Sequence, residues 1–315
     1  MSKRVSIILP VWNGEKYIDR SISSLQKQTF EDFECLIVDD GSTDRTEDIA
    51  RGIAANDERF TVFKIPHGGL SVARNFGIDH SSGEIVFHMD VDDEAVPKMI
   101  ERSVSFLDEN NLEIAFFDAE SVAENISPSR EKAIQRYFTR HMHYNICSGK
   151  EMLDRMSIGN DFVYAVFIQA IRRTAIRKRF LKGLRAQDML YSVQNLFLAN
   201  RAGHLPETLY IKHTTSDSVS VSKPDAHFAW SLLTTITELL KFAEEQNLDR
   251  CFGIEAAIDR TFQALAYAID NLDENDWQEI MSMAFNERTM LVNIGRLIST
   301  PAVRRRLAAM QQDWV

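Results

Sequence analysis

The first 120 residues alternate between short apolar runs and segments with helical spacing, and this rhythm constrains the fold more than any other feature. The apolar runs have the length of buried strands: Val5–Val11, Phe33–Val38, Phe60–Ile65, Ile85–Met89 and Leu112–Phe117. The segments between them indicate helices: Glu15–Gln28, Thr43–Ala54, Ser71–Ile78 and Val96–Asn110. Such alternation predicts an α/β fold with a mostly parallel central sheet flanked by helices.

The rhythm is lost after residue 120, and the chain becomes helical towards its end. Residues 121–148 indicate a long connection, 149–158 a helix, 162–171 a strand or buried helix, and 188–200 an amphipathic helix. Further helices are expected at Phe228–Glu245, Ile254–Leu272, Trp277–Ala284, Arg288–Ile298 and Ala302–Gln311. We expect one domain over 1–222, with halves 1–120 and 121–222, followed by a helical C-terminal region over 223–315.

Carboxylates gather where the expected strands end. They are Asp39 and Asp40 after the second strand, Asp90, Asp92 and Asp93 after the fourth, and Asp118 after the fifth. Ligands of open α/β sheets bind at the carboxyl ends of the strands, and crowded carboxylates suit Mg²⁺ or Mn²⁺. The alternative is a solvated turn that caps the next helix. If a cation binds there, we expect the acids to repel one another, and the turn to be loosely ordered, until metal and nucleotide arrive.

Two residues near these strand ends have both a binding and a structural interpretation. Trp12 follows the first strand and could stack on a base or pack in the core. Gly68 and Gly69 lead into a helix whose first N–H groups can meet an anion. Arg74, one turn further on, could face a diphosphate or pair with an acid at the surface.

Composition and missing motifs exclude several classes of protein. A net charge of −10 argues against a general nucleic-acid binder. There is no GxGxxG after the first strand and no GxxxxGK[ST], so dinucleotide and P-loop sites lack support. No apolar run is long enough to span a membrane, the N-terminal apolar stretch is too short for a signal peptide, and the three cysteines are widely spaced. We therefore expect a cytoplasmic protein with reduced thiols.

Three segments, in this order and spacing, resemble the family 2 glycosyltransferases. They are "VSIILPVWNGEKYIDRSISSLQKQTFEDFECLIVDDGSTDRT", "GGLSVARNFGI" and "GEIVFHMDVDD". The close resemblance covers residues 3–118, and a weaker one continues to about residue 220. It implies the GT-A fold, a nucleotide-diphosphate-sugar donor, usually a UDP-sugar, and a divalent cation, Mn²⁺ or Mg²⁺.

The resemblance also implies roles for individual residues. For the donor nucleotide it indicates Pro10, Val11 and Trp12 as a wall of the base pocket, Asp40 as the uracil-recognising carboxylate with Asp39 beside it, and Arg74 near the donor. For the cation it indicates Asp92 as the direct ligand, Asp90 at the ribose or metal, Asp93 at the sugar or the following helix, and His213 at the diphosphate or metal.

The segment "FLKGLRAQDMLY" resembles the part of the family that carries the general base. The resemblance implies that Asp188 deprotonates the acceptor hydroxyl, so that transfer inverts the anomeric configuration. Gln187 stands where the family usually has Glu, near the sugar or acceptor. Without the resemblance, Asp188 would be interpreted as an acid in the first turn of a helix.

The partners implied are a UDP-sugar and a glycan or lipid-linked acceptor, in bacterial polysaccharide synthesis for the cell envelope. The basic stretch 172–185 could face a membrane or an anionic acceptor, or could be a solvated surface. Peripheral contact with the inner face of the plasma membrane and a homodimer are both compatible with the sequence. A catalytically inactive nucleotide-sugar binder and a nucleotidyltransferase remain as alternatives.

Overall fold

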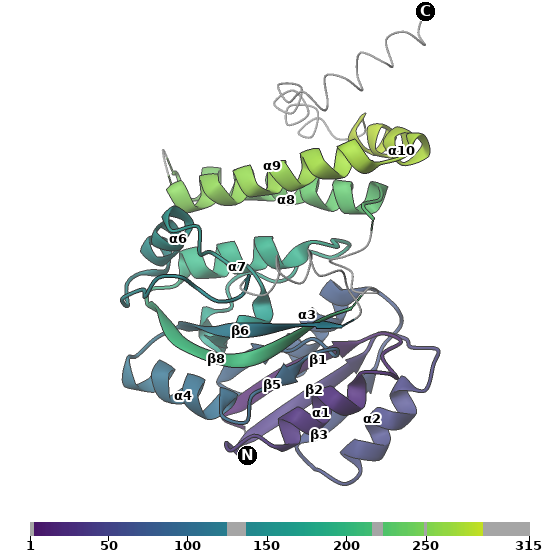
Figure 1. The fold of residues 1–315 in the computed structure, drawn as a ribbon, viewed down its shortest axis with the longest axis vertical. Helices are drawn as coiled ribbons and strands as arrows, with labels where there is room; N and C mark the ends of the chain where they lie inside the picture. The colour runs from purple at the N-terminus through teal and green to yellow at the C-terminus, as the bar shows by residue number, and fades with distance from the viewer. Residues whose placement is uncertain (1–2, 125–136, 216–222, 249–250, 286–315) are drawn as a thin grey trace, which may run out of the picture.

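In the computed structural model, the described residues form one eight-stranded sheet in the order β3-β2-β1-β4-β7-β6-β8-β5 (Figure 1). The described residues are 3–124, 137–215, 223–248 and 251–285. The strands are β1 Val5–Val11, β2 Phe33–Asp39, β3 Phe60–Lys64, β4 Ile85–His88, β5 Glu94–Ala95, β6 Ile114–Glu124, β7 Gln169–Arg172 and β8 Ala202–Thr215.

The sheet is parallel in its first half and mixed in its second. Strands β1, β2, β3 and β4 run parallel, whereas β7 lies antiparallel between β4 and β6. The pair β6–β8 is again parallel, and the short β5 is antiparallel to β8. The predicted α/β fold is confirmed. The sheet contains more antiparallel pairs, however, than the alternation of the first 120 residues suggests. The reason is that β7 and β8, which complete the sheet, come from later sequence.

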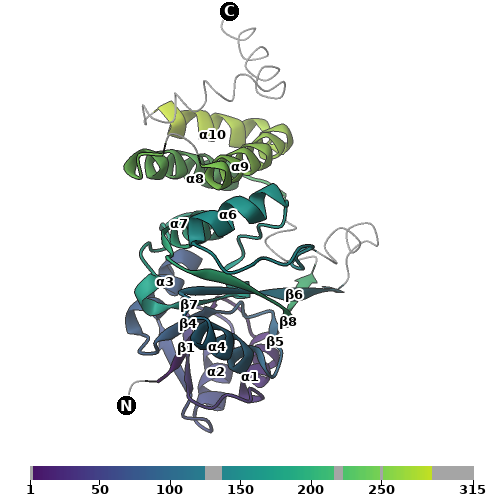
Figure 2. The ribbon, with the colours of Figure 1, turned by 90° about the vertical axis from the view of Figure 1, so that its left-hand side faces the viewer.

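Helices cover both faces of the sheet. They are α1 Ile18–Gln26, α2 Thr46–Ala54, α3 Leu70–His80, α4 Met99–Glu109, α6 Gly149–Ile158, α7 Gln187–Leu198, α8 Ala226–Glu245, α9 Phe252–Asn271 and α10 Glu274–Phe285. Short 3₁₀ turns lie at Val166–Ile168 and Arg173–Ala175. Figure 2 shows α1, α2 and α4 below the sheet, α6 and α7 above it, and α8–α10 as a further layer above these.

Alternation along the central strand explains this layering. All seven residues of β1 are buried, as expected for a parallel strand covered on both faces. Val5, Ile7 and Leu9 belong to the core between the sheet and helices α1 and α4. Ile8, which points to the opposite face, belongs to the core between the sheet and helices α3, α6 and α7.

Helices α8 and α9 share that second core, whereas Trp277 of α10 packs with them in a separate cluster. Leu239, Phe242 and Ile254 pack in the same cluster as Met152 and Leu190. Two hydrogen bonds add to this contact: Gly253 N–H donates to Asp154 (2.6 Å) and Arg260 donates to the Phe162 carbonyl (2.6 Å). Helices α8–α10 agree with the expected ones within a few residues, and the two expected at Arg288–Ile298 and Ala302–Gln311 lie outside the described residues. None of the described helices has the length and hydropathy required to cross a bilayer.

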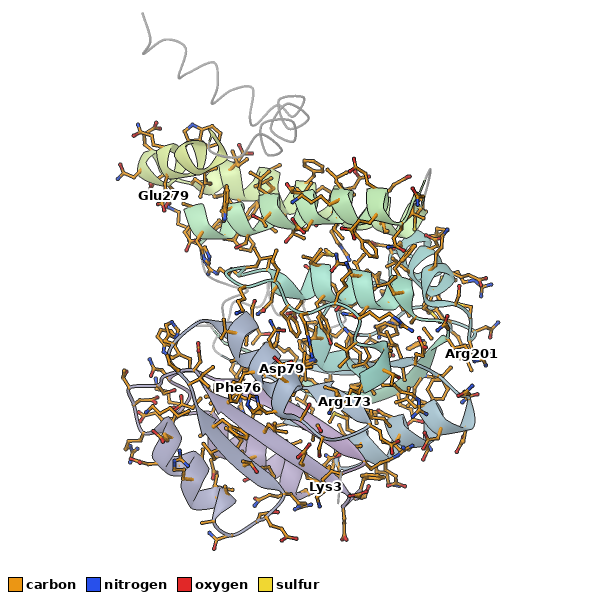
Figure 3. The ribbon with its side chains drawn as sticks, turned by 180° about the vertical axis from the view of Figure 1, so that it is seen from behind. Lys3, Phe76, Asp79, Arg173, Arg201 and Glu279 are labelled. Carbon is orange, nitrogen blue, oxygen red and sulfur yellow. The ribbon has the colours of Figure 1, made fainter. Side chains whose placement is uncertain are left out.

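The basic stretch 172–185 contacts the protein's own acids and carbonyls. Arg173, on the back of the molecule (Figure 3), donates to the carbonyls of Gly83 and Ile78. The ion pairs are Arg172–Asp108, Arg177–Glu113, Lys178–Glu245, Arg179–Asp79 and Arg185–Asp225. These contacts tie secondary-structure elements together, a role that the sequence did not predict for this stretch.

Candidate active site

Three parallel strands bring their carboxyl ends to one edge of the sheet. In the register of β1 with β2, Val11 lies opposite Asp39, and in that of β1 with β4, Ile8 lies opposite His88. The acids that follow β2 and β4 therefore start from the same edge, as their sequence positions predict.

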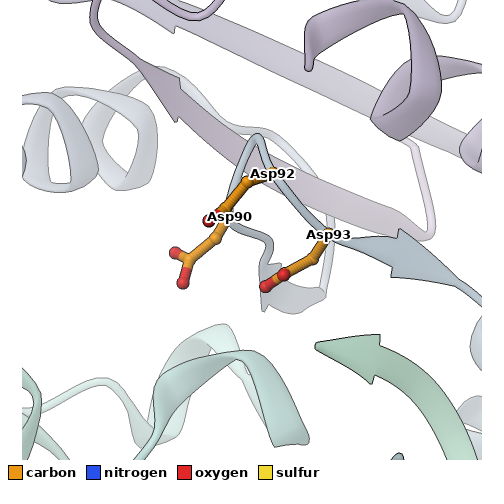
Figure 4. Close-up of side chains that lie close together, drawn as sticks. All are labelled: Asp90, Asp92 and Asp93. Carbon is orange, nitrogen blue, oxygen red and sulfur yellow. The ribbon is translucent and has the colours of Figure 1, made fainter. Parts of the chain in front are cut away.

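The loop between β4 and β5 carries Asp90, Asp92 and Asp93 together (Figure 4). A backbone hydrogen bond from Asp93 N–H to the Asp90 carbonyl (3.2 Å) closes the turn. One carboxylate oxygen from each of the three residues lies within 4.8 Å of the others. Carboxylate oxygens are the ligands that Mg²⁺ or Mn²⁺ prefers, so these three residues are candidates to hold such an ion. Asp92 is the most available of them, since Asp90 and Asp93 have several partners within the protein.

A lysine from β8 offsets the repulsion among these acids. The Lys212 ammonium lies 3.1 Å from Asp93, 3.4 Å from Asp92 and 3.8 Å from Asp90. Burial alone would lower the pKa of Lys212, but the three carboxylates hold it above its ordinary value. The expectation that only metal and nucleotide relieve the repulsion is therefore wrong, because the chain supplies a cation of its own.

Asp93 is the most deeply held of the three acids. Its oxygens accept from the Tyr210 hydroxyl (2.8 Å), the His213 N–H (2.9 Å) and Lys212. Burial raises the pKa of Asp93 well above its ordinary value. These contacts fix the loop to β8, and they do not involve the helix that follows.

Arg74 joins the acids at this edge of the sheet, which we call the rim, to Asp188, the candidate for the general base. Its buried guanidinium donates to Asp90 (2.8 Å) and to Asp188 in the first turn of α7, and it lies 5.2 Å from the centre of the Phe180 ring. Burial would raise the pKa of Asp90, but Arg74 and Lys212 hold it below its ordinary value. The pKa of Asp188 is raised, because burial outweighs the effect of Arg74. Arg74 is therefore neither a free anion-binding residue nor a surface residue.

Gln187, beside Asp188, points to a different partner. It is buried and accepts a hydrogen bond from the Ser71 hydroxyl of α3. This contact and the Arg74–Asp188 pair fix the start of α7 against α3. Direct contact of Gln187 with a sugar or acceptor, implied by the resemblance, stays a prediction.

Trp12, which was expected in the pocket for the nucleotide base, forms an exposed aromatic pair with His67, a residue that was not expected there. Trp12 is 55% exposed and stacks on His67, with ring centroids 4.7 Å apart. Pro10 and Val11 are buried in β1 behind it. Trp12 is thus not a core residue.

Asp40 and Asp39 differ in their hydrogen bonds. Both oxygens of Asp40 accept backbone N–H groups, from Gly68 (2.8 Å) and Gly69 (2.8 Å), in the turn before α3. Asp39 is fully buried and accepts from Ser42 N–H (2.9 Å) with one oxygen. Its other oxygen is a buried acceptor without a hydrogen-bond partner among the described residues, and the Lys64 ammonium lies 4.0 Å from it.

Two other residues, His213 and Asp118, have side-chain partners that the sequence did not predict. The ring nitrogens of His213 contact Glu124 (2.6 Å) and Glu94 (2.8 Å), and the carboxylate group that could hold a metal does not include it. Asp118 is not at a strand end, because β6 continues to Glu124. It pairs with buried Arg140 and His204, so it is not part of the rim.

Sequence reasoning missed Lys212, Tyr210 and His67. Lys212 and Tyr210 reach Asp93 only through the pairing of β8 with β5, across 119 and 117 positions of sequence. No local pattern signals such a contact. The alternation of Tyr210 and Lys212 on one face of a strand would have placed them together, although not next to the acids.

The sheet and its flanking helices match the GT-A fold of glycosyltransferases. Solved structures share this architecture. S. aureus TarS in complex with UDP-GlcNAc aligns with a TM-score of 0.61 at 22% identity, covering 86% of this chain and 72% of that chain. The mannosyltransferase PcManGT from Pyrobaculum calidifontis, in complex with GDP-Man and Mn²⁺, aligns with a TM-score of 0.54 at 15% identity, covering 97% of this chain and 83% of that chain.

The chain belongs to the family described as "Glycosyl transferase family 2", whose model matches residues 6–180. It is 28% identical over 222 residues to the uncharacterized glycosyltransferase YibD of Escherichia coli K12, covering 70% of this chain and 64% of that protein. It is 30% identical over 225 residues to the uncharacterized glycosyltransferase EpsJ of Bacillus subtilis 168, covering 69% and 62%. The match thus spans less than two thirds of each of these relatives.

Proposed function

We propose that the protein is an inverting glycosyltransferase that moves a hexosyl or N-acetylhexosaminyl group from a UDP-sugar to a hydroxyl of a glycan or lipid-linked acceptor. The observation that carries the proposal is the contact of Arg74 with both Asp90 and Asp188. Through this contact one guanidinium bonds both to a carboxylate of the acidic group Asp90, Asp92 and Asp93 and to the base candidate. A donor and an acceptor bound at the two carboxylates would meet there.

The donor half of the proposed site is the rim formed by β1, β2 and β4. Trp12 offers an exposed ring against which a base can stack, and the buried Asp39, whose Oδ2 accepts no hydrogen bond from the described residues and lies 4.0 Å from Lys64, lies at the same strand end. A divalent cation, Mn²⁺ or Mg²⁺, would be held by Asp92 and Asp90 and would neutralise charge on the departing diphosphate. Asp40 would act indirectly, by holding the Gly68–Gly69 turn.

The acceptor half is the start of α7. Asp188 is 22% exposed, and burial raises its pKa, which suits a residue that must take up a proton. In the proposed step its carboxylate accepts the proton of the acceptor hydroxyl as that oxygen bonds to C1 of the sugar. The bond from C1 to the diphosphate oxygen breaks on the opposite face, so an α-linked donor gives a β-linked product. Arg74 holds Asp188 in place throughout.

A donor screen tests the proposal directly. The protein is incubated with UDP-, GDP- and dTDP-sugars and either Mn²⁺ or Mg²⁺, and released nucleotide is measured. Release of UDP is the expected result. Release of pyrophosphate would indicate a nucleotidyltransferase, and binding without any turnover would indicate an inactive nucleotide-sugar binder.

A further inference from the structure

Lys212 occupies the space between the three carboxylates that could hold a metal. Its ammonium is the closest cation to Asp92 and Asp93 among the described ion pairs, at 3.4 and 3.1 Å. We propose that Lys212 is the resident cation of this acidic group, and that a divalent cation can bind Asp90 and Asp92 only by displacing its ammonium. The inference rests on the proposed function, since that function puts a metal at these two residues.

Packing holds the side chain of Lys212 against the acidic group. Only 14% of the side chain is exposed, and the ammonium lies 5.6 Å from the centre of the Phe167 ring. That ring stacks on Tyr210 with centroids 4.8 Å apart. Tyr210 lies on the same face of β8 and donates to Asp93, so the strand presents a hydroxyl and an ammonium to one carboxylate. A solvated surface lysine would have none of these constraints.

The charges around the site leave a place for a second cation. Four carboxyl groups, those of Asp90, Asp92, Asp93 and Asp188, share only two basic side chains, Arg74 and Lys212, so the acids outnumber the cations that they contact. Arg74 is occupied by Asp90 and Asp188, so Lys212 is the cation that can give way. A divalent ion would balance the excess, but a like charge a few ångströms away opposes its binding.

Asp93 provides an anchor for the displaced ammonium. Because Tyr210 and the His213 N–H bind Asp93 independently of Lys212, the loop keeps its position when the ammonium moves. The ammonium can therefore leave Asp92 and Asp90 while remaining beside Asp93. Competition between the lysine and the metal, and not a preformed empty cage, would then set the metal affinity of this protein.

The test is the affinity for Mn²⁺ alone, measured by titration calorimetry without any nucleotide. Lys212→Met keeps the apolar stem and removes the charge, so it should bind Mn²⁺ roughly tenfold more tightly, or better, than the unsubstituted protein. Lys212→Arg keeps the charge and should stay close to the unsubstituted protein. Lys178→Met is the matched control, since it removes a lysine charge paired with Glu245, outside the acidic group, and should leave the affinity unchanged.

Melting temperatures in EDTA and in Mn²⁺ provide the second measurement. Lys212→Met should melt lower than the unsubstituted protein in EDTA and recover more on addition of Mn²⁺, even if it folds only with the metal. An unchanged or weaker Mn²⁺ affinity in Lys212→Met, no Mn²⁺ binding by any variant, or a variant unfolded with and without Mn²⁺ would overturn the inference. The Mn²⁺ titrations use no donor. Failure of the donor screen would therefore overturn the proposed function, whereas the Mn²⁺ affinities of the variants could still be compared.

Discussion

The guanidinium of Arg74 in α3 forms an ion pair with Asp188 at the start of α7, across 114 positions of sequence. The same guanidinium contacts Asp90 on the loop after β4. The pair connects the rim of the parallel sheet with the helix from the second half of the chain. The effect of substitutions at either residue therefore depends on both charge and position.

Replacing Asp188 with asparagine removes the charge of the side chain but keeps its position. Asp188→Asn keeps the shape but cannot accept a proton, so sugar transfer should fall by about 10²- to 10⁴-fold. Binding of UDP, measured by calorimetry, should stay near that of the unsubstituted protein. Asp79→Asn, at an exposed acid paired with Arg179, is the control and should keep full activity. Retention of most activity in Asp188→Asn would show that another residue is the base.

The pH dependence of transfer should reflect the raised pKa of Asp188. The residue accepts a proton only when it is ionised, so the rate should rise with pH as Asp188 loses its proton. Because burial raises this pKa, the rise should be centred above the ordinary value for aspartate of about 3.9. A profile of kcat/KM against pH measures it. A rate that stays flat down to about pH 4 would contradict the assignment.

Loss of Arg74 should destabilise the fold as well as the site. Arg74→Met leaves Asp90 and Asp188 close together without their shared cation, which should cost about 3–5 kcal/mol in free energy of unfolding. Denaturant titration measures the change. The control Arg179→Met removes an exposed arginine and should cost at most about 1 kcal/mol. Equal effects of the two substitutions would show that the buried pairing contributes little.

Removal of the Asp92 carboxylate should uncouple donor binding from the metal. In Asp92→Ala, addition of Mn²⁺ should no longer strengthen UDP binding, because the most available oxygen ligand is lost. Calorimetric titrations of UDP with and without Mn²⁺ measure this difference. Asp48→Ala, at an exposed position of α2, should behave like the unsubstituted protein. A persistent effect of Mn²⁺ in Asp92→Ala would place the metal elsewhere.

The helices after residue 222 should unfold together with the sheet. Phe242 is buried and meets Phe197 of α7 edge to face, with centroids 5.4 Å apart. Phe242→Ala should therefore cost about 3–5 kcal/mol and shift a single unfolding transition seen by both far- and near-ultraviolet circular dichroism. Tyr267→Ala, at a 63% exposed residue, should have little effect. Two separate transitions, of which only one moves, would indicate an independent helical domain.

Local sequence predicted the first half of the fold well. Buried strands such as β1 need unbroken apolar runs, and the helices between them need their own spacing, so these elements can be recognised one at a time. The acids after β2 and β4 could also be placed, because carboxyl ends of neighbouring parallel strands share one edge. Asp118 was misplaced, because the length of β6 depends on its pairing with β8.

The sequence by itself determined the α/β alternation, the acidic strand ends and, through the resemblance, the family. Only the tertiary structure decided which cations meet those acids. Lys212, Arg74 and Asp188 come from three elements whose contacts depend on strand pairing and helix packing over more than 100 positions. Such contacts leave no periodic signal along the chain, because they arise from the free energy of the whole fold and not from any one segment.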